Sequence, residues 1–148
     1  MSLVAKENIT SIIPQRSPII MIDTLEVQTE ALTQCTLEVR ADNIFVEQNR
    51  FQAPGLVENI AQSAAARAGY HYLLREEEPP IGFIGAISKL MIHDTPAVGQ
   101  VITTHIIPKS EVFNITLIRA ESYVGDHMVA ECEMKIVINE PNQGPNQD

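Results

Sequence analysis

The chain has 148 residues, 45% of them hydrophobic and 20% charged, with a formal net charge of −9. This length suits one globular domain with a single core, and the composition is ordinary for such a domain. The acidic balance argues against nucleic acid as a partner, because nucleic acids select basic surfaces, and no apolar run reaches the roughly eighteen residues that predict a membrane span.

The N-terminal part is predicted to form a short helix and a hairpin of two strands. Residues 1–7 contain no basic stretch followed by an apolar one, so we expect no secretory signal and a cytoplasmic protein. Residues 6–13 place isoleucines on one helical face. Ile19–Val27 is rich in apolar and β-branched residues, and Thr33–Arg40 alternates apolar with polar residues. Both patterns predict strands, joined by a turn near Glu30.

A long apolar helix is predicted in the middle of the chain. Residues 41–53 form an irregular polar stretch that ends at Pro54-Gly55, and the helix then runs to about Leu74. A proline near the first turn suits helix entry. The helix is apolar around most of its circumference, which is typical of a buried helix. Its small residues, which predict close packing by other elements, are Ala61, Ala64, Ala65, Ala66, Ala68 and Gly69.

The C-terminal half is predicted to be β-structure. Apolar or alternating segments predict strands over residues 81–92, 101–107, 112–123 and 127–138. Turns are predicted at residues 96–99, 109–111 and 125–126, and a disordered tail over residues 140–148. Cys35 and Cys132 lie within alternating patterns, which predicts buried thiols without a disulfide.

Together these elements predict one α+β domain over residues 1–139. A helix that is apolar nearly all round must bury its whole surface, and each strand of an antiparallel sheet must bury one face. An antiparallel sheet wrapped around one long central helix satisfies both requirements. This arrangement is the hot-dog fold.

Three segments together resemble a known enzyme family. They are residues 13–23 (Ile-Pro-Gln-Arg-Ser-Pro-Ile-Ile-Met-Ile-Asp), residues 54–62 (Pro-Gly-Leu-Val-Glu-Asn-Ile-Ala-Gln), and the pair 83–86 (Phe-Ile-Gly-Ala) and 96–99 (Pro-Ala-Val-Gly). In this order and spacing, from about residue 10 to residue 138, the chain resembles the 3-hydroxyacyl-acyl-carrier-protein dehydratases of fatty-acid synthesis, which are hot-dog proteins.

The resemblance implies an acyl-thioester site at the start of the central helix. In the family, a histidine and a carboxylic acid remove the C2 proton of the substrate and protonate its C3 hydroxyl group. Glu58 is thereby implied as the acid/base, with the N–H groups of Gly55 and Leu56 polarising the thioester carbonyl. Gln62 follows Glu58 on the same helix face and is expected either to orient its carboxyl group or to satisfy a nearby backbone group. No metal or cofactor is implied. The alternative for Glu58 is a solvated carboxylate that stabilises the helix dipole.

The family's catalytic histidine is missing from this sequence. It lies shortly before the central helix, but residues 41–53 contain no histidine. Asn49 is expected to occupy part of that space and to bind substrate, although asparagine cannot shuttle a proton at neutral pH. The remaining histidines, expected at surface or half-buried positions, are His71, His93, His105 and His127.

Three functions are consistent with these residues. The first hypothesis is a 3-hydroxyacyl-thioester dehydratase-like enzyme of fatty-acid or polyketide and polyene biosynthesis, acting on acyl-carrier-protein or CoA thioesters. The second is an acyl thioesterase on the same fold, and the third is a non-catalytic acyl-binding subunit that pairs with an active homologue. A homodimer or a higher even oligomer is expected in each case, because a lone hot-dog sheet leaves an edge strand open. The basic residues available for docking an acidic carrier protein are Arg67, Lys89, Lys109 and Arg119.

Overall fold

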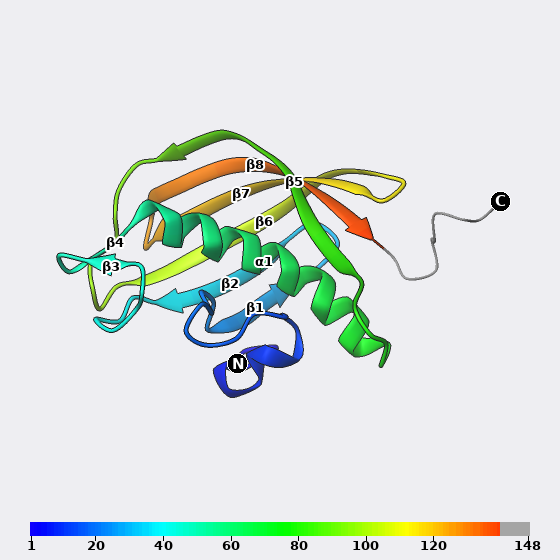
Figure 1. Cartoon of the computed structure of the whole chain (residues 1–148), viewed down its shortest axis with the longest axis horizontal. Coiled ribbons are helices and arrows are strands. Elements are labelled where there is room, and N and C mark those ends of the chain that lie inside the picture. The colour runs from blue at the N-terminus through cyan, green and yellow to red at the C-terminus, as the bar shows by residue number, and fades with distance from the viewer. Residues whose placement is uncertain (140–148) are drawn as a thin grey trace.

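One long helix lies against a curved antiparallel sheet (Figure 1). A computed structural model describes residues 1–139, so the tail predicted over residues 140–148 lies outside the described residues. The helices are η1 (Lys6–Ser11, a 3-10 helix) and α1 (Ala53–Leu74). The strands are β1 (Thr24–Gln28), β2 (Thr33–Glu38), β3 (Val46–Glu47), β4 (Arg50–Phe51), β5 (Ile81–Ile92), β6 (Val101–Val112), β7 (Ile115–Val124) and β8 (His127–Asn139).

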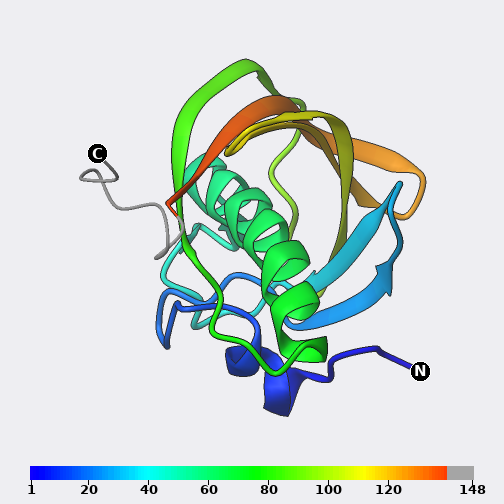
Figure 2. The same cartoon turned by 90° about the vertical axis from the view of Figure 1, so that its right-hand side faces the viewer.

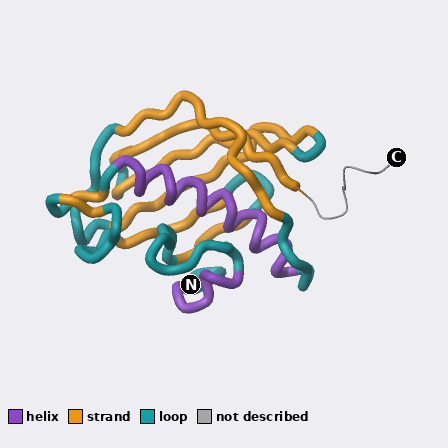
Figure 3. Tube along the Cα trace, in the orientation of Figure 1, coloured by secondary structure: helices purple, strands orange, loops and turns teal. Residues whose placement is uncertain are grey.

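The large sheet contains six strands in the order β1-β2-β6-β7-β8-β5, and each neighbouring pair is antiparallel. The sheet curls around α1, with β1 and β2 on one flank and β5 on the other (Figure 2). The small β3–β4 hairpin and the loops beside it lie at the end of the molecule where α1 begins (Figure 3). The predicted fold, an antiparallel sheet around one long central helix, is confirmed.

Close packing around α1 explains its small residues. Leu56 and Ile60 are fully buried in the main core. A side chain at Gly69 would place its Cβ only 1.8 Å from the carbonyl oxygen of Ile12, so the N-terminal segment touches the helix backbone there. The predicted buried helix is therefore confirmed. Within residues 1–139, no helix has the length and apolar character that crossing a membrane requires.

The predicted strand over residues 19–27 begins later than expected. Only its second half is a strand, since β1 starts at Thr24. The residues before it bond to side chains of α1 instead, as the N–H of Met21 donates to Gln62. β-branched composition indicates an extended backbone, but it does not reveal which groups satisfy that backbone.

The turn predicted at residues 109–111 is wrong. β6 continues to Val112, and the turn falls at Phe113 and Asn114. Pro108 can lie within this strand because β2 pairs with β6 only as far as Ile106, so the proline occupies a stretch with a neighbour on one side alone.

β5 forms one edge of the sheet and exposes apolar side chains on both of its faces. Phe83 and Ile84 are consecutive, so they point to opposite faces, and they are 53% and 47% exposed. The register shifts between Ile84 and Ala86, which places a bulge at Gly85. The other exposed apolar residues of this strand are Ile87, Leu90 and Met91.

Candidate functional site

Glu58 lies in the second turn of α1, where its side chain is half-buried. Its Oε2 accepts a hydrogen bond of 2.7 Å from Nε2 of Gln62, so the i, i+4 spacing brings the two side chains together. Gln62 is completely buried. Within residues 1–139, the hydrogen bonds of the Glu58 carboxyl group involve Oε2 alone, which leaves Oε1 open to a ligand.

Gln62 also holds the segment that precedes β1. Its Oε1 accepts from the N–H of Met21 at 2.6 Å, and its Nε2 donates to the carbonyl of Ile19 at 2.8 Å. If the oxygen and nitrogen of the amide were exchanged, the NH₂ group would face the N–H of Met21 and the oxygen would face the carbonyl of Ile19, so neither hydrogen bond could form. Gln62 can therefore offer Glu58 only an N–H group.

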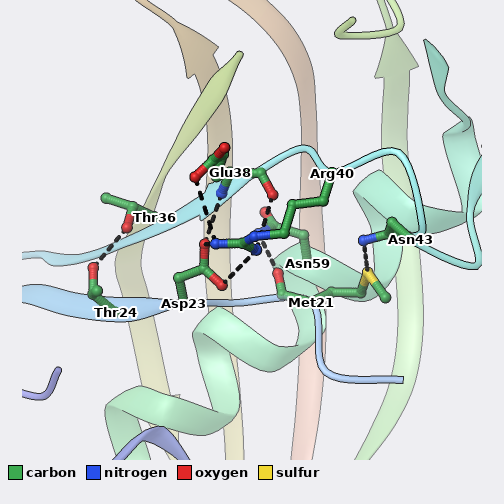
Figure 4. A network of polar contacts seen from close by, with 8 residues as sticks. All are labelled: Met21, Asp23, Thr24, Thr36, Glu38, Arg40, Asn43 and Asn59. Atoms are coloured by element: carbon green, nitrogen blue, oxygen red, sulfur yellow. Dashed lines mark hydrogen bonds and ion pairs between the residues drawn. The ribbon is translucent and has the colours of Figure 1, made fainter. Parts of the chain in front are cut away.

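An ion pair anchors the same segment to the end of β2. Arg40 donates from Nη1 to Oδ1 of Asp23 at 3.2 Å and from Nη2 to Oδ2 at 3.0 Å (Figure 4). The N–H of Glu38 donates to the same Oδ2 at 2.8 Å. The hydrogen bonds to Asp23 raise the pKa of Arg40 above its ordinary value. The chain beside Gln62 is thus held from both α1 and β2.

The N–H groups of Gly55 and Leu56 both point at one acceptor in the structure. They donate to the carbonyl of Gln52, at 2.9 Å and 3.3 Å respectively. Gly55 also has a packing role, because a Cβ there would lie 2.6 Å from the ring of Phe51 and 2.7 Å from Phe45. A thioester carbonyl at this turn would have to share these donors with Gln52.

Asn49 lies at the exposed tip of the β3–β4 hairpin. Gln48 and Asn49 have φ values of 51° and 67°, the left-handed conformation that a two-residue hairpin turn requires and that asparagine adopts readily. The carbonyl of Asn49 accepts from the N–H of Val98. Turn geometry alone therefore accounts for an asparagine here, and the hydrogen bonds of residues 1–139 do not join its side chain to Glu58.

All four histidines are engaged away from Glu58. Nε2 of His93 lies 2.7 Å from Glu131, and that of His127 lies 3.4 Å from Asp94. The ring of His105 packs against Tyr123 at 5.4 Å between centroids. His71 lies in the last turn of α1, with Nε2 3.1 Å from Arg75.

Three of the four basic residues considered for carrier docking contact groups of the fold. Nζ of Lys89 lies 3.4 Å from Glu133. Arg119 bridges two carboxylates on neighbouring strands, Glu121 at 2.8 Å and Glu131 at 2.7 Å. Arg67 is likewise occupied, donating to the β1–β2 turn. These three side chains therefore do not form a free cationic patch.

Both cysteines are buried and unpaired, as predicted. Burial raises the pKa of the Cys35 thiol to about 12 and that of Cys132 to about 11, so neither is a reactive thiolate near neutral pH. In the part of the chain that the structure describes, no group of three or more histidine, cysteine or acidic side chains is arranged to hold a metal ion.

Asn59 is a buried polar residue of this region that the sequence did not single out. It follows Glu58 directly, is completely buried, and donates from Nδ2 to the carbonyl of Met21 at 2.8 Å. The available signal was an amide between apolar residues on the inner side of a buried helix, where an unsatisfied polar group would be costly.

A sequence-family comparison adds to this geometry. The model of the family described as ApeP-like, ApeP dehydratase, matches residues 7–144. None of the curated protein sequences compared with the chain matches it significantly.

Solved structures share the fold at low sequence identity. The dehydratase heterocomplex ApeI:P from Xenorhabdus doucetiae has a chain that is 13% identical, with a TM-score of 0.82 over 90% of this chain and 92% of that one. A sigma28-regulated virulence protein from Campylobacter jejuni is 10% identical, with a TM-score of 0.67 over 92% and 93% of the two chains. A hypothetical thioesterase with coenzyme A from Streptococcus pneumoniae is 8% identical, with a TM-score of 0.65 over 78% and 84%.

Proposed function

Because the chain belongs to the ApeP-like dehydratase family, we propose that it acts on 3-hydroxyacyl thioesters of acyl-carrier protein or CoA, in fatty-acid or polyketide and polyene biosynthesis. The observation that carries this proposal is the half-buried carboxyl group of Glu58 near the start of the buried helix, with one oxygen held by Gln62 and the other open. The dipole at a helix start favours the negative charge that develops on a thioester oxygen.

Glu58 is assigned the proton transfer at the substrate's hydroxyl group. Since Oε2 accepts from Gln62, Oε1 is the atom that carries the proton. Removal of the C2 proton supplies the electron pair of the new C2–C3 double bond, the C3–O bond breaks, and Oε1 protonates the departing hydroxyl to give water. Glu58 is then left as a carboxylate and must regain a proton before the next turnover.

The thioester oxygen is assigned to the N–H groups of Gly55 and Leu56. Both already donate to the carbonyl of Gln52, and the Leu56 bond is the longer at 3.3 Å. Substrate binding would therefore replace or share an existing acceptor. Asn49, at the exposed tip of the β3–β4 hairpin that precedes α1, is assigned as a contact for the polar end of the substrate.

The base that takes the C2 proton is assigned to a partner chain. The four histidines of this chain all contact groups other than Glu58. The structure with a TM-score of 0.82 is described as a dehydratase heterocomplex, which makes a related hot-dog chain a natural partner. A second copy of this chain is the alternative.

The partner is expected to bind along β5. This edge strand is apolar and exposed on both faces, as at Phe83 and Ile84, and such a surface is stabilised by continuing the sheet into a second subunit. Ile87→Lys should lower the assembly mass measured by light scattering, whereas Ile44→Lys, at an exposed isoleucine outside β5, should not. Equal masses for the two variants would contradict this interface.

The reaction is tested with 3-hydroxyacyl-CoA and the matching carrier-protein thioester, followed by enoyl absorbance. We expect turnover, alone or with a histidine-bearing hot-dog partner, and a loss of about a hundredfold or more in Glu58→Gln. Glu47→Gln is the matched control, because Glu47 is an exposed glutamate on β3. Free thiol released without an enoyl product, and lost in Glu58→Gln, would identify a thioesterase instead. Full dehydration by a mixed complex containing Glu58→Gln would make this chain a non-catalytic subunit.

A further inference from the structure

A chain of buried hydrogen bonds crosses the core from the sheet to α1. Oγ of Ser122 on β7 lies 2.7 Å from Oγ1 of Thr104 on β6. Oγ1 of Thr104 donates to Oδ1 of Asn59 at 2.6 Å. Nδ2 of Asn59 donates to the carbonyl of Met21 at 2.8 Å, and Figure 4 shows this last contact beside the Asp23 ion pair. The three polar side chains are completely buried.

The direction of every bond in this chain is determined. Because Nδ2 of Asn59 donates to a carbonyl, which can only accept, the amide oxygen is left facing Thr104. Thr104 has a single hydroxyl proton, and Asn59 takes it. Ser122 must therefore donate to Thr104. The hydroxyl groups of Ser122 and Thr104 donate toward α1, and the amide of Asn59 on α1 then donates away from the helix to the N-terminal segment.

The chain meets the candidate site at Met21. Its carbonyl accepts from Asn59, and its N–H donates to Oε1 of Gln62. Nε2 of Gln62 then donates to Oε2 of Glu58. One residue of the N-terminal segment is thus held from both sides by amides that lie three positions apart on α1.

Apolar packing would not supply this positional control. The interior side of α1 is rich in small residues, which allow close approach but resist sliding along the helix axis only weakly. Hydrogen bonds between neutral groups depend strongly on distance and angle, and leaving one unmade in the core costs about 1–3 kcal/mol. A buried polar set that is fully satisfied therefore fixes one position of the helix relative to the strands.

We propose that Asn59, Thr104 and Ser122 are positioning residues that set the place of Glu58 relative to the bound thioester. This inference rests on the proposed role of Glu58 as the acid. Asn59 fixes the helix turn that bears Glu58, Thr104 and Ser122 tie that turn to β6 and β7, and none of the three touches substrate.

The test compares Thr104→Val, which keeps the side-chain shape but removes the hydroxyl, with Ser63→Ala as matched control. Ser63 is also completely buried and also loses a hydroxyl bond, to the carbonyl of Asn59, but lies outside the chain. Thr104→Val should lower kcat by about tenfold to a hundredfold, because small misplacements of an acid are costly, while KM stays within about twofold. Ser63→Ala should keep kcat within about twofold, and Thr104→Ser should restore turnover.

A second measurement does not depend on turnover. The side-chain NH₂ resonances of Gln62 and the carboxyl carbon resonance of Glu58 should shift in Thr104→Val and stay near their wild-type positions in Ser63→Ala. Unchanged resonances in Thr104→Val, or equal losses of kcat in the two variants, would overturn the positioning role. Full activity in Glu58→Gln would instead refute the proposed function, and the resonances would still decide whether the chain positions that side chain.

Discussion

Replacing Gln62 by glutamate should destabilise the protein in a pH-dependent way. The new carboxyl group can still accept from the N–H of Met21, but its second oxygen replaces the Nε2 that donates to Ile19 and to Glu58. Leaving the half-buried Ile19 carbonyl without this donor costs about 1 kcal/mol. Bringing an acceptor to the 2.7 Å position beside the half-buried Glu58 replaces a hydrogen bond by a contact between two carboxyl groups, one of them at the completely buried position 62. We expect a total loss of about 3 kcal/mol or more at pH 8.

The sign of the pH effect follows from burial and charge. Both raise the pKa of the introduced carboxyl group in the folded state above its value of about 4.3 in the unfolded chain. The variant's stability relative to wild type is therefore best below that value and falls as the pH rises. The difference in the free energy of unfolding between wild type and variant should widen by about 1.4 kcal/mol per pH unit, until the introduced carboxyl group ionises in the folded protein.

Urea unfolding of both proteins at several pH values between 5 and 8 measures this gap. Gln100→Glu is the matched control, because Oε1 of Gln100 also accepts a backbone N–H, from Ala97, but the residue is exposed. Its stability should stay within about 0.5 kcal/mol of wild type. A difference that stays constant over this range would refute the reasoning that burial raises the pKa of the introduced carboxyl group at position 62.

Two further predictions concern close packing and thiol chemistry. Gly69→Ala should lower the free energy of unfolding by about 3 kcal/mol or more, because its Cβ would lie 1.8 Å from the carbonyl oxygen of Ile12. Gly82→Ala is the control, since the nearest atom to its Cβ would be 3.4 Å away. It should change the free energy of unfolding by less than about 1 kcal/mol in the same urea experiment. Cys35 and Cys132, whose pKa values are raised to about 12 and about 11 by burial, should not react with Ellman's reagent at pH 8 in the folded protein and should both react in guanidinium. Rapid reaction of the folded protein would contradict the burial of these thiols.

The sequence predicts the architecture well because hydrophobic period is a direct signal of burial. The small apolar residues between Pro54 and Leu74 predict a buried helix, and the alternation around Cys132 predicts a strand with one face in the core. The strand boundaries are less predictable. Segment 19–23 has strand composition, but its backbone is bonded to side chains of α1 from distant sequence positions, and no local pattern encodes that choice.

The candidate site, like the fold, was only partly predictable from the sequence. The spacing of Glu58 and Gln62 predicts their contact, because one helix supplies both residues. The role of Asn59 becomes apparent only in the folded structure, where β6 brings Thr104 within hydrogen-bond distance of it and β7 brings Ser122 beside Thr104. For Asn49 the sequence suggested a substrate contact, but the left-handed conformation of the hairpin turn is by itself a sufficient reason for an asparagine at this position.

The strand order also bears on how the protein folds. β6, β7 and β8 are joined by short turns and can pair locally, whereas the pairing of β2 with β6 joins segments on either side of α1 in the sequence. Pairings between distant segments form slowly, because the chain must lose the conformational entropy of a long loop before the contacts between the strands can stabilise it. The contact of Asn59 with Thr104 closes the part of that loop that runs from α1 to β6. We therefore expect the β6–β8 meander to form early, and the helix bearing Glu58 to reach its final position only in the slow step that brings in β2.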